Sequence, residues 1–237
     1  MRRLCHQVLA FFLNRVLRVA VGEEDRNERA EALYWLGNVS TALCKYTEAE
    51  ESYTQARKTY ASLGDGLGLA NALRGLGGVY HRQSKITKAG ASLVWAQNVY
   101  TDLGDDQGHA STLCGLGHIY RAQLNYKQAE KSFTETGKIY TCIGDAQGQA
   151  KLLHGLGEVY RLQFKFAEAE DSLSQAQSIY TRIGDDVGQA NTLLGMGNVY
   201  CAWSEYPQAT SSYTTMKAIY AGLGDEEGQA NALYGLG

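Results

Sequence analysis

The chain has 237 residues, a formal net charge of −3 at pH 7 and 44% hydrophobic residues. A charge this small gives no overall attraction to nucleic acid or to an anionic membrane. The five cysteines share no CxxC spacing, which favours reduced thiols in the cytosol over a disulfide framework or a zinc site. We therefore expect a cytoplasmic protein with no metal and no cofactor, and with Cys114 and Cys201 partly exposed.

Residues 1–30 precede the regular part of the sequence. The start, MRRLCHQVLAFFLNRVLRVAV, carries two arginines before an apolar run that polar and charged residues interrupt. One interpretation is a degenerate second helix of a preceding repeat followed by a linker, because Leu9 and Leu13 stand 40 residues before Ala49 and Tyr53. An uncleaved basic amphipathic anchor and a signal peptide are the alternatives, and we expect no membrane span.

From residue 31 the same pattern returns every 40 residues without insertions. LGDGLGLANALRGLGGVY, from Leu63, recurs as LGDDQGHASTLCGLGHIY from Leu103 and as IGDDVGQANTLLGMGNVY from Ile183. Five units thus span residues 31–230, and residues 231–237 begin the first helix of a sixth. We expect either a fragment of a longer array or an end that pairs with another molecule. A phosphate-binding glycine loop occurs once per domain, so glycines in each unit indicate a structural role.

Each unit contains two helical patterns. In the second unit Leu73, Leu76 and Tyr80 share one face of a first helix, and Ala89 and Leu93 share one face of a second helix. The equivalent positions of the other units are largely apolar or aromatic as well. These columns are the predicted core.

Glycine and aspartate mark the unit boundaries. Gly64 suits the left-handed residue that ends a helix, and Asp65 suits the N-cap of the next one. Pro207, the single proline, falls where a second helix should begin. Gly75 and Gly77 lie inside a first helix at a cost of about 1 kcal/mol each relative to alanine. We expect them to allow close approach to the second helix or to a neighbouring repeat.

The column pattern resembles the tetratricopeptide repeat (TPR), and the residues that carry this resemblance in the second unit are Leu73, Leu76, Gly77, Tyr80, Ala89, Leu93 and Ala96. The period exceeds the usual length of about 34 residues, and alanine or threonine replaces the closing proline. This long form is similar to repeats of kinesin light chain, of Pins-type adaptors, and of arrays attached to NB-ARC or NACHT signalling ATPases. The resemblance implies an all-α, right-handed α-solenoid of stacked antiparallel helix pairs.

The resemblance also implies that the first helices line a concave groove that holds a peptide. The candidate groove residues are Asn38, Asn71, Arg74, His81, Arg82, His118, Arg121, Lys151, His154, Glu158, Arg161, Asn191 and Asn198. The asparagines are candidates for pairing with peptide backbone, although Asn71 equally fits a plain solvent-facing residue. These columns vary among the units, which we attribute to recognition of a partner, with neutral surface drift as the alternative.

The groove columns hold five basic side chains against Glu31 and Glu158, so their net charge is +3 in a chain of −3. This contrast predicts an acidic peptide segment or a C-terminal carboxylate as the partner.

The sequence favours a non-enzymatic scaffold for protein binding. It contains no P-loop, no HExxH and no GxSxG motif, and its five histidines are scattered, whereas a metal needs three or four converging ligands. The alternative is a fragment of the ligand-sensing array of a signalling NTPase whose nucleotide-binding domain is not in this chain. An enzyme or an RNA binder ranks last, because most tyrosines stand in core columns instead of forming a stacking surface.

Overall fold

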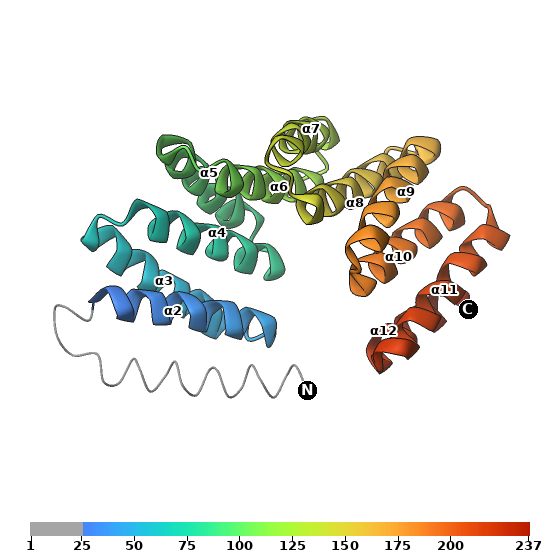
Figure 1. Cartoon of the computed structure of the whole chain (residues 1–237), viewed down its shortest axis with the longest axis horizontal. Helices are drawn as coiled ribbons and strands as arrows, with labels where there is room; N and C mark the ends of the chain where they lie inside the picture. The colour runs from blue at the N-terminus through green and yellow to red at the C-terminus, as the bar shows by residue number, and fades with distance from the viewer. Residues whose placement is uncertain (1–25) are drawn as a thin grey trace. The chain divides into compact units, whose positions relative to one another are not determined.

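The computed structural model describes residues 26–237, so the interpretations of residues 1–25 fall outside it. The described chain is all α-helical, with short turns between successive helices (Figure 1). The first helices of the repeats are α2 (Arg26–Ala42), α4 (Gly66–Arg82), α6 (Asp106–Ala122), α8 (Ala146–Leu162), α10 (Asp186–Ala202) and α12 (Glu226–Leu236). The second helices are α3 (Tyr46–Leu63), α5 (Ile86–Leu103), α7 (Tyr126–Ile143), α9 (Phe166–Ile183) and α11 (Tyr206–Leu223).

The helices form two compact units. The N-terminal unit ends at Gln123 and contains α2 to α6, and the C-terminal unit begins at Leu124 and contains α7 to α12. Within each unit every helix packs against the next one along the chain, and successive first helices also contact one another. Each unit is therefore a stack of helical hairpins, as the repeat predicts. The first described helix, α2, begins at Arg26, five residues before the predicted start of the first unit at residue 31.

The predicted boundary signals are confirmed. The five glycines that end the second helices have φ between 66° and 73°, the left-handed region in which glycine is favoured. Asp65 caps α4 by accepting a hydrogen bond on Oδ1 from the backbone N–H of Gly68 at 2.9 Å, and its four equivalents make the same bond. Pro207 lies in the first turn of α11.

The glycines inside the first helices leave space for a large side chain from a neighbouring second helix. A Cβ built on Gly77 would lie 2.6 Å from Leu93 Cγ, and one on Gly115, in the next first helix, would lie 3.2 Å from Leu93 Cδ1. A Cβ on Gly75 would lie 2.6 Å from Tyr53 Cε1. The second helix therefore packs closely against the first helix of its own repeat and against that of the following repeat.

A polar contact joins several neighbouring repeats, between a tyrosine of a first helix and a glutamate of the preceding second helix. The contacts are Tyr80 with Glu50, Tyr160 with Glu130 at 3.4 Å, and Tyr200 with Glu170 at 2.7 Å. Between α5 and α6 the glutamate position holds Gly90, so the boundary at Tyr120 has no such carboxylate.

One expectation needs correction. Cys114 is buried instead of partly exposed, because His118, one helical turn further along α6, lies against its thiol with 3.9 Å between Sγ and Nε2. Cys201 is exposed, as expected. Two of the turns inside the hairpins carry exposed apolar side chains, since Leu124 is 71% and Phe164 is 80% exposed there. Within residues 26–237 no helix is long and apolar enough to cross a membrane.

Candidate functional site

The candidate groove residues all project from first helices, and the two units divide them. The N-terminal unit holds Asn38, Asn71, Arg74, His81, Arg82, His118 and Arg121. The C-terminal unit holds Lys151, His154, Glu158, Arg161, Asn191 and Asn198. Arg82, Lys151 and Asn191 are exposed, and the other ten are partly buried.

A hydrogen-bonded chain fixes Arg74 in the N-terminal unit. Arg74 donates from Nε to the hydroxyl oxygen of Tyr100 at 3.3 Å, and this hydroxyl donates to Asn71 Oδ1 at 2.8 Å. Because Tyr100 is only 1% exposed, its hydroxyl needs a partner inside the protein. Asn71 is therefore not a plain solvent-facing residue, since its amide oxygen serves the core.

The other candidate asparagines also accept bonds from buried tyrosines, and these contacts are Tyr53 to Asn38 at 2.7 Å, Tyr213 to Asn198 at 2.9 Å and Tyr220 to Asn191 at 3.1 Å. In the column of Asn38 the remaining repeats have Gly78, His118 and Glu158, and the position of Tyr53 then holds Leu93, Phe133 and Leu173. In this column asparagine thus occurs only where the facing side chain carries a hydroxyl. Part of the variation in this column therefore follows from packing within the repeat and needs no binding partner to explain it. Because the amide oxygens of these asparagines bond to tyrosines, only their amide N–H groups are candidates for contact with a ligand.

Three cationic or titratable side chains lie close together at the C-terminal ends of α4 and α6. Burial lowers the pKa of His81, and the positive charges of Arg121 and Arg82 lower it further. His81 is therefore neutral at pH 7 and leaves the charge to the two arginines. Among the described residues neither arginine forms an ion pair, and the buried Nε of Arg121 has no hydrogen-bond partner. We call His81, Arg82 and Arg121 the basic cluster.

The C-terminal unit neutralises its groove arginine. Arg161 donates to Glu158 Oε2 from Nη2 at 2.9 Å and from Nε at 3.2 Å. The +3 charge of the groove columns is therefore distributed unevenly, since arginines without a carboxylate partner stand in the N-terminal unit. Across residues 26–237 no three His, Cys, Asp or Glu side chains gather in a way that would hold a metal ion.

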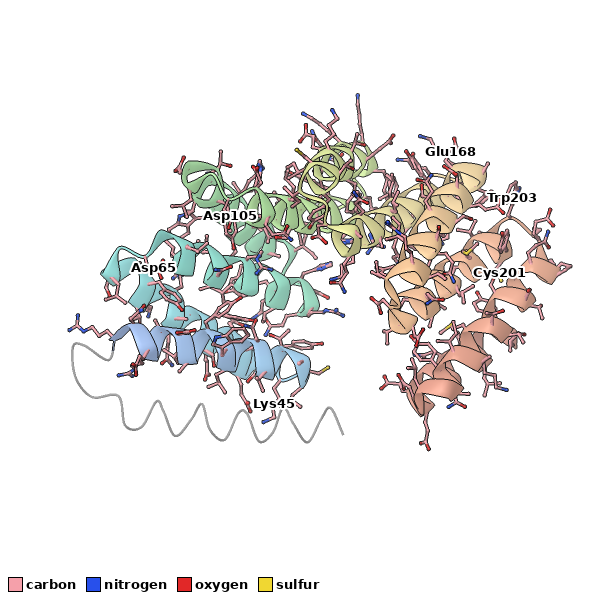
Figure 2. The ribbon with its side chains drawn as sticks, in the orientation of Figure 1. Lys45, Asp65, Asp105, Glu168, Cys201 and Trp203 are labelled. Atoms are coloured by element: carbon pink, nitrogen blue, oxygen red, sulfur yellow. The ribbon has the colours of Figure 1, made fainter. Side chains whose placement is uncertain are left out.

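Sequence reasoning missed an aromatic surface in the C-terminal unit. The ring of Phe164 meets Phe166 edge-on with centroids 6.1 Å apart, and Phe166 stacks on Trp203 at 5.9 Å. We call these three residues the aromatic edge. Figure 2 shows Trp203 and Glu168 toward the same end of the helices. A signal was present, because glutamine stands at the position of Trp203 in three other repeats.

We compared this helical architecture with known protein families and solved structures. The tetratricopeptide repeat family model matches residues 28–102 and 148–222. A search of curated proteins finds no match.

Solved structures share the fold at low sequence identity. BtubC (BKLC) from P. vanneervenii is 18% identical with a TM-score of 0.74, over 92% of this chain and 91% of that one. The Rap conjugation gene regulator of plasmid pLS20, in complex with the Phr* peptide, is 15% identical with a TM-score of 0.75, over 90% of this chain and 60% of that one. A Signal Transduction ATPase with Numerous Domains from Pyrococcus horikoshii, with a tetratricopeptide repeat sensor, is 16% identical with a TM-score of 0.68, over 92% of this chain and 37% of that one. The family model covers more than half of the sequence, and the helical hairpins repeat as that family requires, so this chain belongs to the tetratricopeptide repeat family.

Proposed function

We propose that this chain is a non-enzymatic scaffold that binds an acidic peptide segment along its first helices, with the basic cluster as the anchor. The observation that carries the proposal is that Arg82 and Arg121, whose charges both act on His81, have no carboxylate partner among the described residues. A peptide carboxylate would supply that partner and would pair with a guanidinium through charge-assisted hydrogen bonds.

The surroundings favour an extended peptide over a small anion. Arg74 lies about two helical turns and Asn71 about three turns before His81 on the same helix, and Arg74 is held in place through Tyr100. Asparagine N–H groups beside the arginines suit peptide carbonyl oxygens. The regulator of plasmid pLS20, which has the same fold, is seen with a bound peptide, and this agrees with peptide binding as the use of such an array.

The test exchanges charge in the basic cluster. Arg82→Glu with Arg121→Glu should abolish capture of a fluorescein-labelled library of acidic peptides, while the melting curve stays unchanged. The matched control is Arg29→Glu with Lys58→Glu, because both residues are exposed in the same unit, lie outside the candidate groove and give the same change of charge. Wild-type binding should weaken as salt rises, because exposed charges are then screened. Equal capture by wild type and the Arg82/Arg121 variant would contradict the proposal, and so would equal loss in the control.

A second proposal places the same array in a signalling ATPase as its ligand sensor. The similarity to the Pyrococcus horikoshii ATPase favours it, since that protein carries a tetratricopeptide repeat sensor and this chain spans 37% of it. Peptide binding would then be coupled to a nucleotide switch on the same polypeptide. Sequencing of the surrounding gene decides between the two proposals: a P-loop encoded in frame supports the sensor, and a continuous reading frame without one contradicts it.

A further inference from the structure

The aromatic edge is the most unusual surface of the C-terminal unit. Phe164 is 80% exposed and Trp203 is 39% exposed, and Phe166 between them is partly buried. In the N-terminal unit the turn between α4 and α5 carries Gln83 and Ser84 at these positions, and the turn between α2 and α3 carries Leu43 and Cys44, so neither turn has an aromatic pair there. Adjacent exposed aromatic rings on a soluble repeat protein mark an interaction surface.

The backbone makes phenylalanine costly at this turn. Phe164 has φ of +60°, and the four equivalent turn residues have φ between +59° and +65°, so the turn requires the left-handed region. A bulky side chain in that region is strained by about 1–2 kcal/mol. Serine, which stands there in two other repeats, avoids the exposure of a large apolar ring. The edge-on contact with Phe166 leaves Phe164 80% exposed, so packing within the chain does not explain its presence.

Two carboxylates stand close to the aromatic edge along the chain, each two residues after one of its rings. Glu168 lies in the first turn of α9, and Glu205 stands immediately before α11. In the described part of the chain neither carboxylate forms an ion pair, although Glu205 accepts a hydrogen bond from Gln208. Lys165, which stands between Phe164 and Phe166 in the sequence, is already engaged, because its Nζ lies 4.0 Å from Glu130 and 5.4 Å from the ring centroid of Tyr160. The surface therefore combines aromatic faces with carboxylates that lack a cation.

We propose that the aromatic edge binds an arginine-bearing segment of a partner protein. A guanidinium is planar and weakly hydrated, so it stacks on tryptophan and phenylalanine and also pairs with a carboxylate through two hydrogen bonds. Glu168 and Glu205 repel an anionic lipid surface or a nucleic acid, which would otherwise suit exposed aromatic rings. This site is separate from the basic cluster in position and in charge preference, so it stands whether or not an acidic segment binds the N-terminal unit.

The indole N–H signals of the three tryptophans provide the test. In ¹⁵N-labelled protein, acetyl-Arg-Gly-Arg-Gly-Arg-amide should move the signal of Trp203, which Trp203→Gln identifies by its loss. Trp35 is an internal control, because it is 48% exposed, lies 3.4 Å from Glu31 and meets Tyr34 edge-on at 5.6 Å, but within residues 26–237 has no stacked ring such as Phe166 on Trp203. The signal of Trp35 should stay in place, and the same peptide with glutamate instead of arginine should move neither signal.

Matched variants separate the site from general hydrophobic exposure. Phe164→Ser introduces the residue found in two equivalent turns and should weaken binding of the arginine peptide about tenfold, which corresponds to about 1.4 kcal/mol. Leu124→Ser removes an exposed apolar side chain from another left-handed turn and should leave binding unchanged. Glu168→Gln with Glu205→Gln should weaken binding without moving the melting curve. The proposal is overturned if Trp35 and Trp203 respond equally, if Phe164→Ser binds like wild type, or if a lysine peptide binds as tightly as the arginine peptide.

Discussion

Two adjacent glycines of α4 should respond oppositely to alanine. At Gly78 a Cβ meets nothing within 4 Å, so Gly78→Ala gains only helix propensity and should stabilise the protein by about 1 kcal/mol. At Gly77 the Cβ would lie 2.6 Å from Leu93 Cγ, which is the branch point of a side chain that is 4% exposed. Gly115 of α6 contacts Leu93 from the other side, so the side chain of Leu93 cannot move away from a new Cβ on Gly77. Overpacking of this kind costs about 1–3 kcal/mol, and we expect Gly77→Ala to be less stable than Gly78→Ala by that amount.

Urea denaturation followed by far-UV circular dichroism measures the difference. The midpoint should rise for Gly78→Ala and fall relative to it for Gly77→Ala, with similar slopes, because both variants expose the same surface on unfolding. The double variant Gly77→Ala with Gly78→Ala should be less stable than Gly78→Ala alone, since only the substitution at Gly77 touches Leu93. If Gly77→Ala proves as stable as Gly78→Ala, the close approach of α4 and α5 does not explain why glycine stands in this column.

Three further predictions concern caps and titration. Asp185→Ala removes the acceptor of the Gly188 N–H and should cost about 1 kcal/mol in urea denaturation. Gly184→Ala, at φ +69°, should cost about 1 kcal/mol in the same assay, and retained stability would contradict the left-handed assignment. Burial raises the pKa of Tyr53 from 10.0 to about 12, so the folded state keeps this proton longer than the unfolded state does. The contribution of this tyrosine to the free energy of unfolding is therefore fully present below pH 10 and is lost as the pH rises to 12. In Tyr53→Phe, which cannot lose this proton, circular dichroism should show a smaller decrease in stability over the same pH range.

Sequence periodicity was sufficient for the features that depend on one helix or one turn. The left-handed Gly64, the capping Asp65 and the apolar faces follow from local geometry, and each unit repeats them. The close approach at Gly77 was also predictable, because an interior glycine needs a packing reason. Only its partner, Leu93, required the structure.

The candidate site was harder to predict because its polar side chains form hydrogen bonds with residues of other helices. The oxygen of Asn38 meets a tyrosine 15 residues away, and the oxygen of Asn71 meets one 29 residues away. A single column cannot reveal such pairs, so asparagines that serve the core were grouped with ligand-binding candidates. Arg161 and Glu158 were both counted in the groove, yet their distance of 2.9 Å removes them from the free charge. The formal charge of a groove therefore depends on pairing as well as on composition.

The glycine at position 90 gives the N-terminal unit an uneven mechanical strength. In a repeat array each boundary is held mainly by nearest-neighbour contacts, and the boundary between α5 and α6 lacks the tyrosine–carboxylate bond that joins other repeats. Tension applied along the chain would separate α5 from α6 before it separates α3 from α4. The absence of one side chain at position 90 thus decides which boundary between repeats separates first under tension.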